Sequence, residues 1–330
     1  MTSDSSSGAA AARSLVDVLA SGVGTVVLDG GLSNQLRAGG HDLSDELWSA
    51  RLLMERPEAI TEAHLAYFEA GADVAITSSY QATFEGFARR GVSRERAGEL
   101  LALSVGLARE AARRAGSKGV RGPLWVAASV GPYGAMLADG SEYRGRYGLS
   151  VGELERFHRP RVEVLAEARP DVLALETVPD VDEARALVRA VRGIGVPSWL
   201  SYSVAGGRTR AGQSLEEAFA VAADADEVIA VGVNCCAPED VDSAVATAVR
   251  VTGKPVVVYP NSGETWDAGV RGWSGRSTFS PERVVGWERA GARLIGGCCR
   301  VGPGAVSGIA QALRAGPASG QGSAPGGVDL

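Results

Sequence analysis

The chain has 330 residues, a hydrophobic content of 45% and a formal net charge of −6 at pH 7. This composition is typical of a soluble protein with a large core, and the acidic balance excludes a nucleic-acid partner bound through a basic surface. No apolar run reaches the roughly 20 residues of a membrane span. The Ser/Ala-rich start of the chain lacks the cationic and apolar segments of a signal peptide, so we expect a cytoplasmic protein.

From residue 25 onward, short β-branched apolar runs alternate with longer amphipathic segments. Continuous apolar runs indicate strands that are buried on both faces of a parallel sheet. Eight such runs are present, at 25–28, 74–76, 124–128, 172–175, 198–202, 228–233, 255–259 and 293–295. Helices are predicted between them at 45–70 (broken near Pro57), 94–114, 153–168, from 181, from 214, from 281 and at 304–314.

Eight strand–helix units predict an α/β fold, a single-domain (β/α)8 TIM-type barrel. An open doubly wound sheet is the alternative. We expect the barrel to span residues 21–315, with a disordered N-terminal tail at 1–20 and a disordered Gly/Ser/Pro-rich tail at 316–330. In such barrels the active site lies at the carboxyl ends of the strands. The polar and metal-binding residues at these ends therefore define the predicted site.

All four cysteines occur as two adjacent pairs, Cys235-Cys236 and Cys298-Cys299, each directly after a predicted strand. Adjacent cysteines make a poor disulfide framework, although a disulfide between the two pairs stays open. In a reducing cytoplasm the thiols would be free to bind a metal, and soft sulfur ligands favour zinc. We predict Cys235, Cys298 and Cys299 as Zn²⁺ ligands with a fourth position open, and Cys236 as a packing residue. A closed site that uses all four cysteines is the alternative.

The glycines of Gly296-Gly297 are expected to let the backbone turn, so that both following cysteines reach the metal. Zinc held by three thiolates is a weak Lewis acid for hydrolysis. It suits a substrate thiol instead, because it lowers the thiol pKa while the sulfur stays nucleophilic. The cysteine pattern thus predicts alkyl transfer onto sulfur, with no catalytic residue beyond the zinc-activated thiol.

Three segments resemble the zinc-dependent homocysteine S-methyltransferase family: Asp29-Gly30-Gly31, Gly232–Cys235 and Gly296–Cys299. Further segments resemble its S-methylmethionine-using members more than the related betaine-using ones, namely 76–83, 129–134, 139–145, 157–161 and 259–264. The resemblance covers residues 25–314. It implies a methyltransferase of methionine biosynthesis, in which homocysteine thiolate takes a methyl group from S-methylmethionine, with S-adenosylmethionine as an alternative donor.

The resemblance also assigns roles in amino-acid binding. It implies that Glu176 grips the homocysteine ammonium, that Asp29 contributes a second acidic position, and that Gly30 lets substrate approach the backbone. A fold-stabilising ion pair is the alternative for Glu176, and a turn residue is the alternative for Asp29.

Residue type suggests the remaining contacts. Asn234 adjoins a metal ligand and is expected to orient it, with a plain strand-end hydrogen bond as the alternative. Tyr80 and Tyr133 are expected to face the sulfonium, whose positive charge favours aromatic rings. Tyr143 is a third tyrosine of this kind. Ordinary core packing is the alternative for all three.

Other functions remain open on the sequence alone. The acceptor could be selenocysteine or another small thiol, and a non-catalytic zinc or redox-sensing barrel is a further alternative. Only small-molecule partners are expected, with neither nucleic acid nor membrane. A monomer is favoured over a dimer, because the C-terminal tail looks too short and too polar for assembly.

Overall fold

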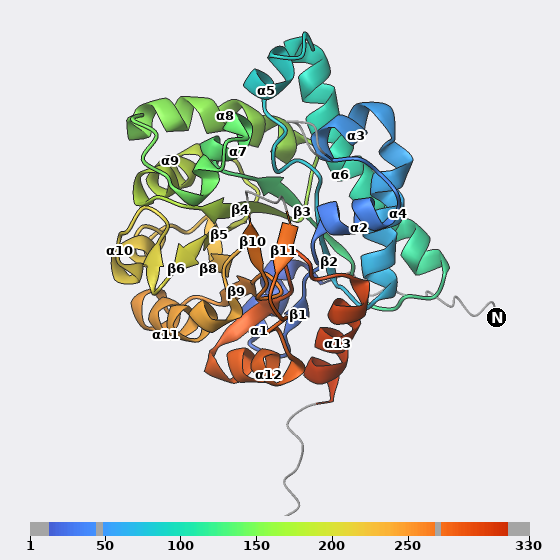
Figure 1. Cartoon of the computed structure of the whole chain (residues 1–330), viewed down its shortest axis with the longest axis vertical. Coiled ribbons are helices and arrows are strands. Elements are labelled where there is room, and N and C mark those ends of the chain that lie inside the picture. Colours follow the sequence, from blue (N-terminus) through green and yellow to red (C-terminus); the bar gives the residue numbers. More distant parts are fainter. Residues whose placement is uncertain (1–12, 44–48, 268–271, 316–330) are drawn as a thin grey trace, which may run out of the picture.

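The protein is a (β/α)8 barrel in a computed structural model that describes residues 13–43, 49–267 and 272–315 (Figure 1). Eight parallel strands pair in the order β1-β12-β9-β8-β5-β4-β3-β2. A parallel bridge between Leu28 and Val74 joins the first and last of these strands, so the sheet closes and the open-sheet alternative is wrong. The strands are β1 (Val26–Val27), β2 (Val74–Ile76), β3 (Trp125–Val130), β4 (Val172–Val178), β5 (Ser198–Tyr202), β8 (Val228–Asn234), β9 (Val256–Tyr259) and β12 (Ala292–Ile295).

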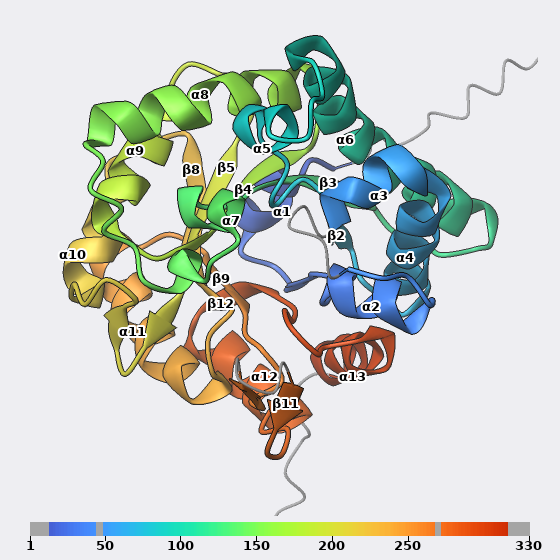
Figure 2. The same cartoon turned by 45° about the horizontal axis from the view of Figure 1, so that its top comes forward.

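Helices surround the strands on the outside of the barrel (Figure 2). The eight strands coincide with the eight predicted apolar runs to within three residues at each end, because burial between helices and barrel interior demands apolar side chains on both faces. The helices are α2 (Leu32–Ala38), α3 (Ser49–Glu55), α4 (Pro57–Glu69), α5 (Phe84–Ala88), α6 (Arg94–Ser117), α8 (Val151–Glu167), α9 (Val181–Val191), α10 (Leu215–Ala220), α11 (Val241–Thr252), α12 (Pro281–Ala290) and α13 (Pro303–Arg314).

One boundary of the predicted domain is corrected. The N-terminal tail predicted for 1–20 contains helix α1 (Leu15–Ser21), which begins at Ser14 with a reciprocal capping box to Asp17. Leu15 and Leu19 are buried among the first residues of several strands, such as Trp125, and α1 therefore closes the amino-terminal end of the barrel. Residues 1–12 and the tail predicted at 316–330 lie outside the described residues.

Short elements occupy the loops that follow the strands. Hairpin β6 (Val204–Ala205) and β7 (Arg208–Thr209) follows β5, and hairpin β10 (Thr265–Asp267) and β11 (Gly272–Ser274) follows β9. Helix α7 (Tyr133–Leu137), the 3₁₀ turn η1 (Ser141–Tyr143) and the turn η2 (Pro238–Asp240) complete the set. They lie at the carboxyl end of the barrel, where the site is built. Among the described helices, none combines the length and apolar character that a membrane crossing needs.

Candidate metal centre and substrate-binding site

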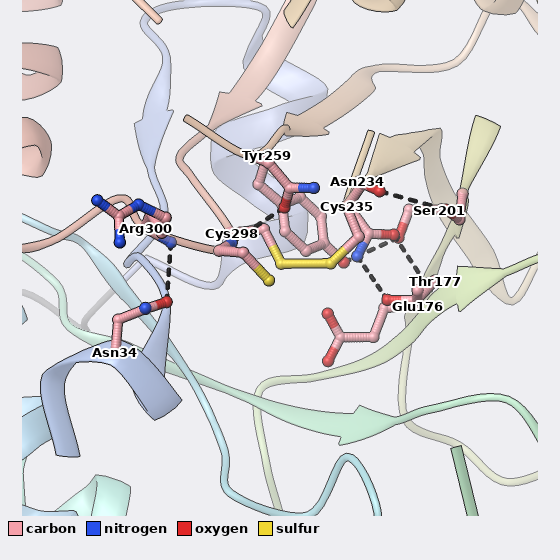
Figure 3. The surroundings of a disulfide bond; sticks show 12 residues. Asn34, Glu176, Thr177, Ser201, Asn234, Cys235, Tyr259, Cys298 and Arg300 are labelled. Atoms are coloured by element: carbon pink, nitrogen blue, oxygen red, sulfur yellow. Dashed lines mark hydrogen bonds between the residues drawn. A yellow bond between two sulfur atoms is a disulfide. The ribbon is translucent and has the colours of Figure 1, made fainter. Parts of the chain in front are cut away.

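Three cysteine sulfurs meet at the carboxyl ends of β8 and β12. The sulfur atoms of Cys235, Cys298 and Cys299 all lie within 4.8 Å of one another. In this structure Cys235 and Cys298, which are 63 residues apart, form a disulfide, so the cross-pair bond left open above is the one seen here (Figure 3). The three cysteines predicted as ligands, one from the first pair and two from the second, thus lie together at one point.

Backbone hydrogen bonds hold the three cysteines at the strand ends. The Cys235 N–H donates to the Tyr259 carbonyl at 3.2 Å, and the Cys298 N–H donates to the Pro260 carbonyl at 2.7 Å. The Cys299 N–H donates to Oδ1 of Asn261 at 3.1 Å. Strand β9, which lies between β8 and β12, and the residues that follow it thus position every sulfur.

The glycines before Cys298 serve a different purpose from the one predicted. Neither Gly296 nor Gly297 has a positive φ, whereas Cys235 does, at 48°. A Cβ on Gly296 would lie 2.6 Å from the Leu28 side chain and 2.7 Å from the Asp29 carbonyl, and one on Gly297 would lie 2.2 Å from Val301. Glycine is therefore required because the neighbouring loop packs closely, and not because the chain turns through a left-handed conformation.

Cys236 points away from the other three cysteines. Its side chain is fully buried in the core between the strands and the outer helices. Burial raises the pKa of this thiol well above its usual range. The prediction that Cys236 packs in the core is confirmed, and the alternative of a site closed by all four cysteines finds no support in the described residues.

The three-sulfur cluster fits a soft metal ion. Burial raises the pKa of the Cys299 thiol to about 11, and Glu142 and Glu176 add to this increase. The site therefore disfavours a bare thiolate, and a bound cation would reverse that. An all-sulfur donor set with three ligands is typical of zinc, copper(I) or iron–sulfur chemistry, not of magnesium or calcium. Reduction of the disulfide is a precondition, because only thiolates ligate.

Two carboxylates lie at the carboxyl ends of β4 and β1, which β3 and β2 separate in the barrel. Glu176 on β4 accepts a short hydrogen bond from the Ser129 hydroxyl and is 6% exposed. Burial raises its pKa to about 7, against the effect of hydrogen bonds from Ser129 and Tyr259. Asp29 accepts from the Ile76 N–H at 2.9 Å, which helps to close the barrel between β1 and β2. Burial raises the pKa of Asp29 well above its usual range, and the negative charge of Glu176 raises it further.

Asn234, the last residue of β8, is occupied by contacts within the protein. Its Oδ1 accepts from the Thr177 N–H at 2.7 Å and from the Ser201 hydroxyl at 2.9 Å, and its Nδ2 donates to the Thr177 hydroxyl at 2.7 Å. Thr177 has a φ of 57°, an uncommon conformation for a β-branched residue. The amide thus joins three strand ends and fixes the backbone beside Glu176 (Figure 3).

Tyr80 and Tyr133 differ in their surroundings. The pKa of Tyr80 is raised by burial and then by nearby Tyr143, Glu142 and Glu176. Its ring packs on the residues after β3, because a Cβ on Gly131 would lie 2.6 Å from it. The ring of Tyr133 instead packs edge-on against Phe157 of α8, with ring centroids 4.9 Å apart.

Gly30 is required by contacts within the protein. A Cβ at this position would lie 2.1 Å from the Val301 carbonyl and 2.8 Å from the Tyr67 ring. The chain itself fills the space that a side chain would need. The approach of substrate to this backbone stays a prediction, and the group that lies against Gly30 in the structure is the loop after β12.

Several polar residues of the site lie outside the predicted set. Ser129 bonds to Glu176, and Tyr259 bonds to Ser201 at 2.8 Å and to the Trp199 N–H at 3.2 Å. Thr177 contacts Asn234 as described. Position at a strand end was the only signal in the sequence for these residues, because their partners depend on the register between neighbouring strands.

Comparisons with known proteins agree with this site. The model of the homocysteine S-methyltransferase family matches residues 26–313. Homocysteine S-methyltransferase 4 of Zea mays is 48% identical over 88% of this chain and 90% of its own length. Homocysteine S-methyltransferase YbgG of Bacillus subtilis is 43% identical, over 88% and 94%.

Solved structures of the homocysteine methyltransferase MmuM from Escherichia coli are also similar. The metallated form is 41% identical, with a TM-score of 0.81, and the match covers 89% of this chain and 98% of that one. The oxidized form is 42% identical, with a TM-score of 0.78 and coverage of 86% and 94%. From the barrel, the three-cysteine cluster and these matches, the chain belongs to the homocysteine S-methyltransferase family.

Proposed function

We propose that this chain transfers a methyl group from a sulfonium donor to the sulfur of homocysteine, with zinc held by Cys235, Cys298 and Cys299. The observation that carries the proposal is the meeting of three sulfurs within 4.8 Å, beside two buried carboxylates, at the carboxyl end of the barrel. Family membership makes the chain a methyltransferase, and the names of its relatives support homocysteine as the acceptor.

When bound, zinc would lower the pKa of the substrate thiol, so that thiolate is present at neutral pH. The chain supplies the position of the acceptor. Glu176 and Asp29 are buried carboxylates with raised pKa values, and a substrate ammonium would offset both the burial and their mutual repulsion. We assign the homocysteine ammonium to this pair. Fixing the thiolate in line with the donor methyl group converts a bimolecular displacement into an effectively unimolecular one.

The transfer is a single displacement. The homocysteine sulfur forms a bond to the methyl carbon as the carbon–sulfur bond of the donor breaks, and the donor leaves as a neutral thioether. S-methylmethionine is the proposed donor, with S-adenosylmethionine as the alternative. The displacement needs no general base, because the acceptor enters the step already as a thiolate.

Redox state sets whether the site can work. A disulfide between Cys235 and Cys298 ties up two of the three proposed ligands. Structures of MmuM exist in both a metallated and an oxidized form, which supports two such states here. We therefore expect activity only after reduction.

The test uses reduced, zinc-loaded protein with homocysteine and, separately, S-methylmethionine, S-adenosylmethionine or betaine. Methionine should form with a sulfonium donor and not with betaine. Cys298→Ser should fold, lose zinc and lose activity, while the matched Cys236→Ser should keep both. Full activity in protein stripped of zinc by a chelator would refute the proposal. Faster turnover of selenocysteine than of homocysteine would mean that selenocysteine is the methyl acceptor.

A further inference from the structure

The turn η1 after β3 carries a buried carboxylate whose partner is not in the described part of the chain. Glu142 is 6% exposed, and its Oε2 atom is buried with no hydrogen-bond partner among the described residues. Arg144, two residues further on, forms its ion pair with Asp139 instead, at 3.6 Å. Buried carboxylates in folded proteins are normally paired or hydrogen-bonded, and an unpaired one points to a missing cationic ligand.

Glu142 is held rigidly at the carboxyl end of the barrel. A Cβ on Gly134 of α7 would lie 2.4 Å from the Glu142 nitrogen, so the turn packs directly on that helix. The same Cβ would lie 2.6 Å from the Ser141 carbonyl carbon and 2.8 Å from the Glu142 Cα. The backbone of Glu142 is therefore fixed against α7, in the loop that follows β3 at the carboxyl end of the barrel.

A second charge without an ionic partner lies beside the same turn. The Arg210 guanidinium lies over the Tyr143 ring, 5.3 Å from its centroid, and its Nε donates to the Ser203 hydroxyl at 3.2 Å. Arg210 is half-buried, and no carboxylate pairs with it among residues 13–43, 49–267 and 272–315. The Ser203 hydroxyl in turn donates to the Cys235 carbonyl at 3.3 Å, which ties Arg210 to the metal centre.

We propose that Glu142 and Arg210 together bind the amino-acid end of the methyl donor, Glu142 taking the α-ammonium and Arg210 the α-carboxylate. This assignment rests on the proposed function and extends it from the acceptor to the donor. A sulfonium has no N–H to donate, so it cannot satisfy the Glu142 oxygen, whereas an ammonium can. A guanidinium is suited to a carboxylate by its fork of N–H donors. Glu142, which precedes Tyr143 in η1, and Arg210, which lies over the Tyr143 ring, thus offer the two opposite charges that a zwitterion needs.

The binding test avoids turnover and zinc. Calorimetric titration of reduced, chelator-treated protein would use three sulfonium probes. The first is S-methylmethionine, which has both charged groups. The second is dimethylsulfoniopropionate, which lacks the ammonium. The third is (3-aminopropyl)dimethylsulfonium, which lacks the carboxylate.

Glu142→Gln should weaken the binding of S-methylmethionine and of the aminopropyl compound about 10- to 100-fold, as expected for loss of a charge-assisted hydrogen bond. The binding of dimethylsulfoniopropionate should be unchanged. Arg210→Met should weaken binding of the two probes that carry a carboxylate, S-methylmethionine and dimethylsulfoniopropionate. Binding of the aminopropyl compound should stay unchanged. Glu167→Gln, at the exposed end of α8, is the matched control and should change none of them.

Kinetics give a second readout with the zinc-loaded enzyme. Glu142→Gln should raise KM for the donor and leave KM for homocysteine unchanged, and it should not lower Tm, because it removes an unpaired buried charge. An increase in KM for homocysteine, or equal weakening of all three probes by Glu142→Gln, would overturn the assignment. Absence of turnover in the parent enzyme with every donor would instead refute the proposed function itself.

Discussion

Replacing Asn234 by alanine tests how the site is held together. The Asn234 amide makes three hydrogen bonds, two to Thr177 and one to Ser201, and is fully buried. Loss of the amide leaves the Thr177 N–H without a hydrogen-bond acceptor, because hydroxyl groups can rotate to other partners but a backbone N–H cannot. The Ser201 hydroxyl keeps its hydrogen bond with the Tyr259 hydroxyl, at 2.8 Å.

The magnitude follows from these contacts. An orphaned buried N–H costs about 1–3 kcal/mol, and each of the other two lost bonds costs about 0.5–1.5 kcal/mol. Asn234→Ala should therefore lower the free energy of unfolding by about 2–6 kcal/mol. It should also raise KM for homocysteine, because Thr177 adjoins Glu176 and shares its backbone.

Urea denaturation of reduced protein measures the free energy of unfolding. A double-mutant cycle with Ser201→Ala separates the shared bond, and we expect a coupling energy of about 0.5–1.5 kcal/mol. A loss of under about 1 kcal/mol for Asn234→Ala, with an unchanged KM, would refute the view that this amide positions the Glu176 strand end.

Three further predictions concern packing and pH. Gly232→Ala places a Cβ 1.7 Å from the Val257 carbonyl and should destabilise the protein by about 3 kcal/mol or more. Gly98→Ala in α6, which has open space around it, is the control and should stabilise the protein by about 0.5–1 kcal/mol. The urea midpoints of the two variants, compared with that of the parent protein, measure both effects. Glu176 has a pKa of about 7 in the folded protein, above the ordinary 4.5, so the folded state holds a proton that the unfolded state has lost between these values. Stability of the metal-free protein should then fall by up to about 3 kcal/mol from pH 4.5 to 7, and Glu176→Gln should remove that part of the slope; an identical slope in the variant would contradict this. Leu15→Ala should cost about 2–4 kcal/mol by calorimetry, because this side chain closes the barrel, and a neutral result would mean that α1 is dispensable.

The strands were predictable because their burial demands an unbroken apolar run, and this signal is local. Helix α1 was missed because a two-turn helix has too few residues to show periodicity, although Ser14 and Asp17 carry its capping box. The β6–β7 hairpin has strands of only two residues and gave no signal for the same reason.

The meeting of Cys235, Cys298 and Cys299 was predictable from residue type and position at strand ends. The contacts around them were not, because they depend on three-dimensional neighbours. Asn234 meets Thr177 only through the register of strands far apart in the sequence. Gly297 is explained by Val301, which packs against it from the following loop. The unpaired state of Glu142 likewise appears only once the surrounding residues are placed.

X-ray absorption at the zinc edge tests the central claim most directly. In reduced, zinc-loaded protein without substrate we predict three sulfur neighbours at about 2.3 Å and one lighter neighbour. Addition of homocysteine should raise the sulfur number to four. Four sulfurs before homocysteine is added would mean that Cys236 closes the site, and fewer than three would mean that Cys235, Cys298 and Cys299 do not share one ion. Either result would contradict the account.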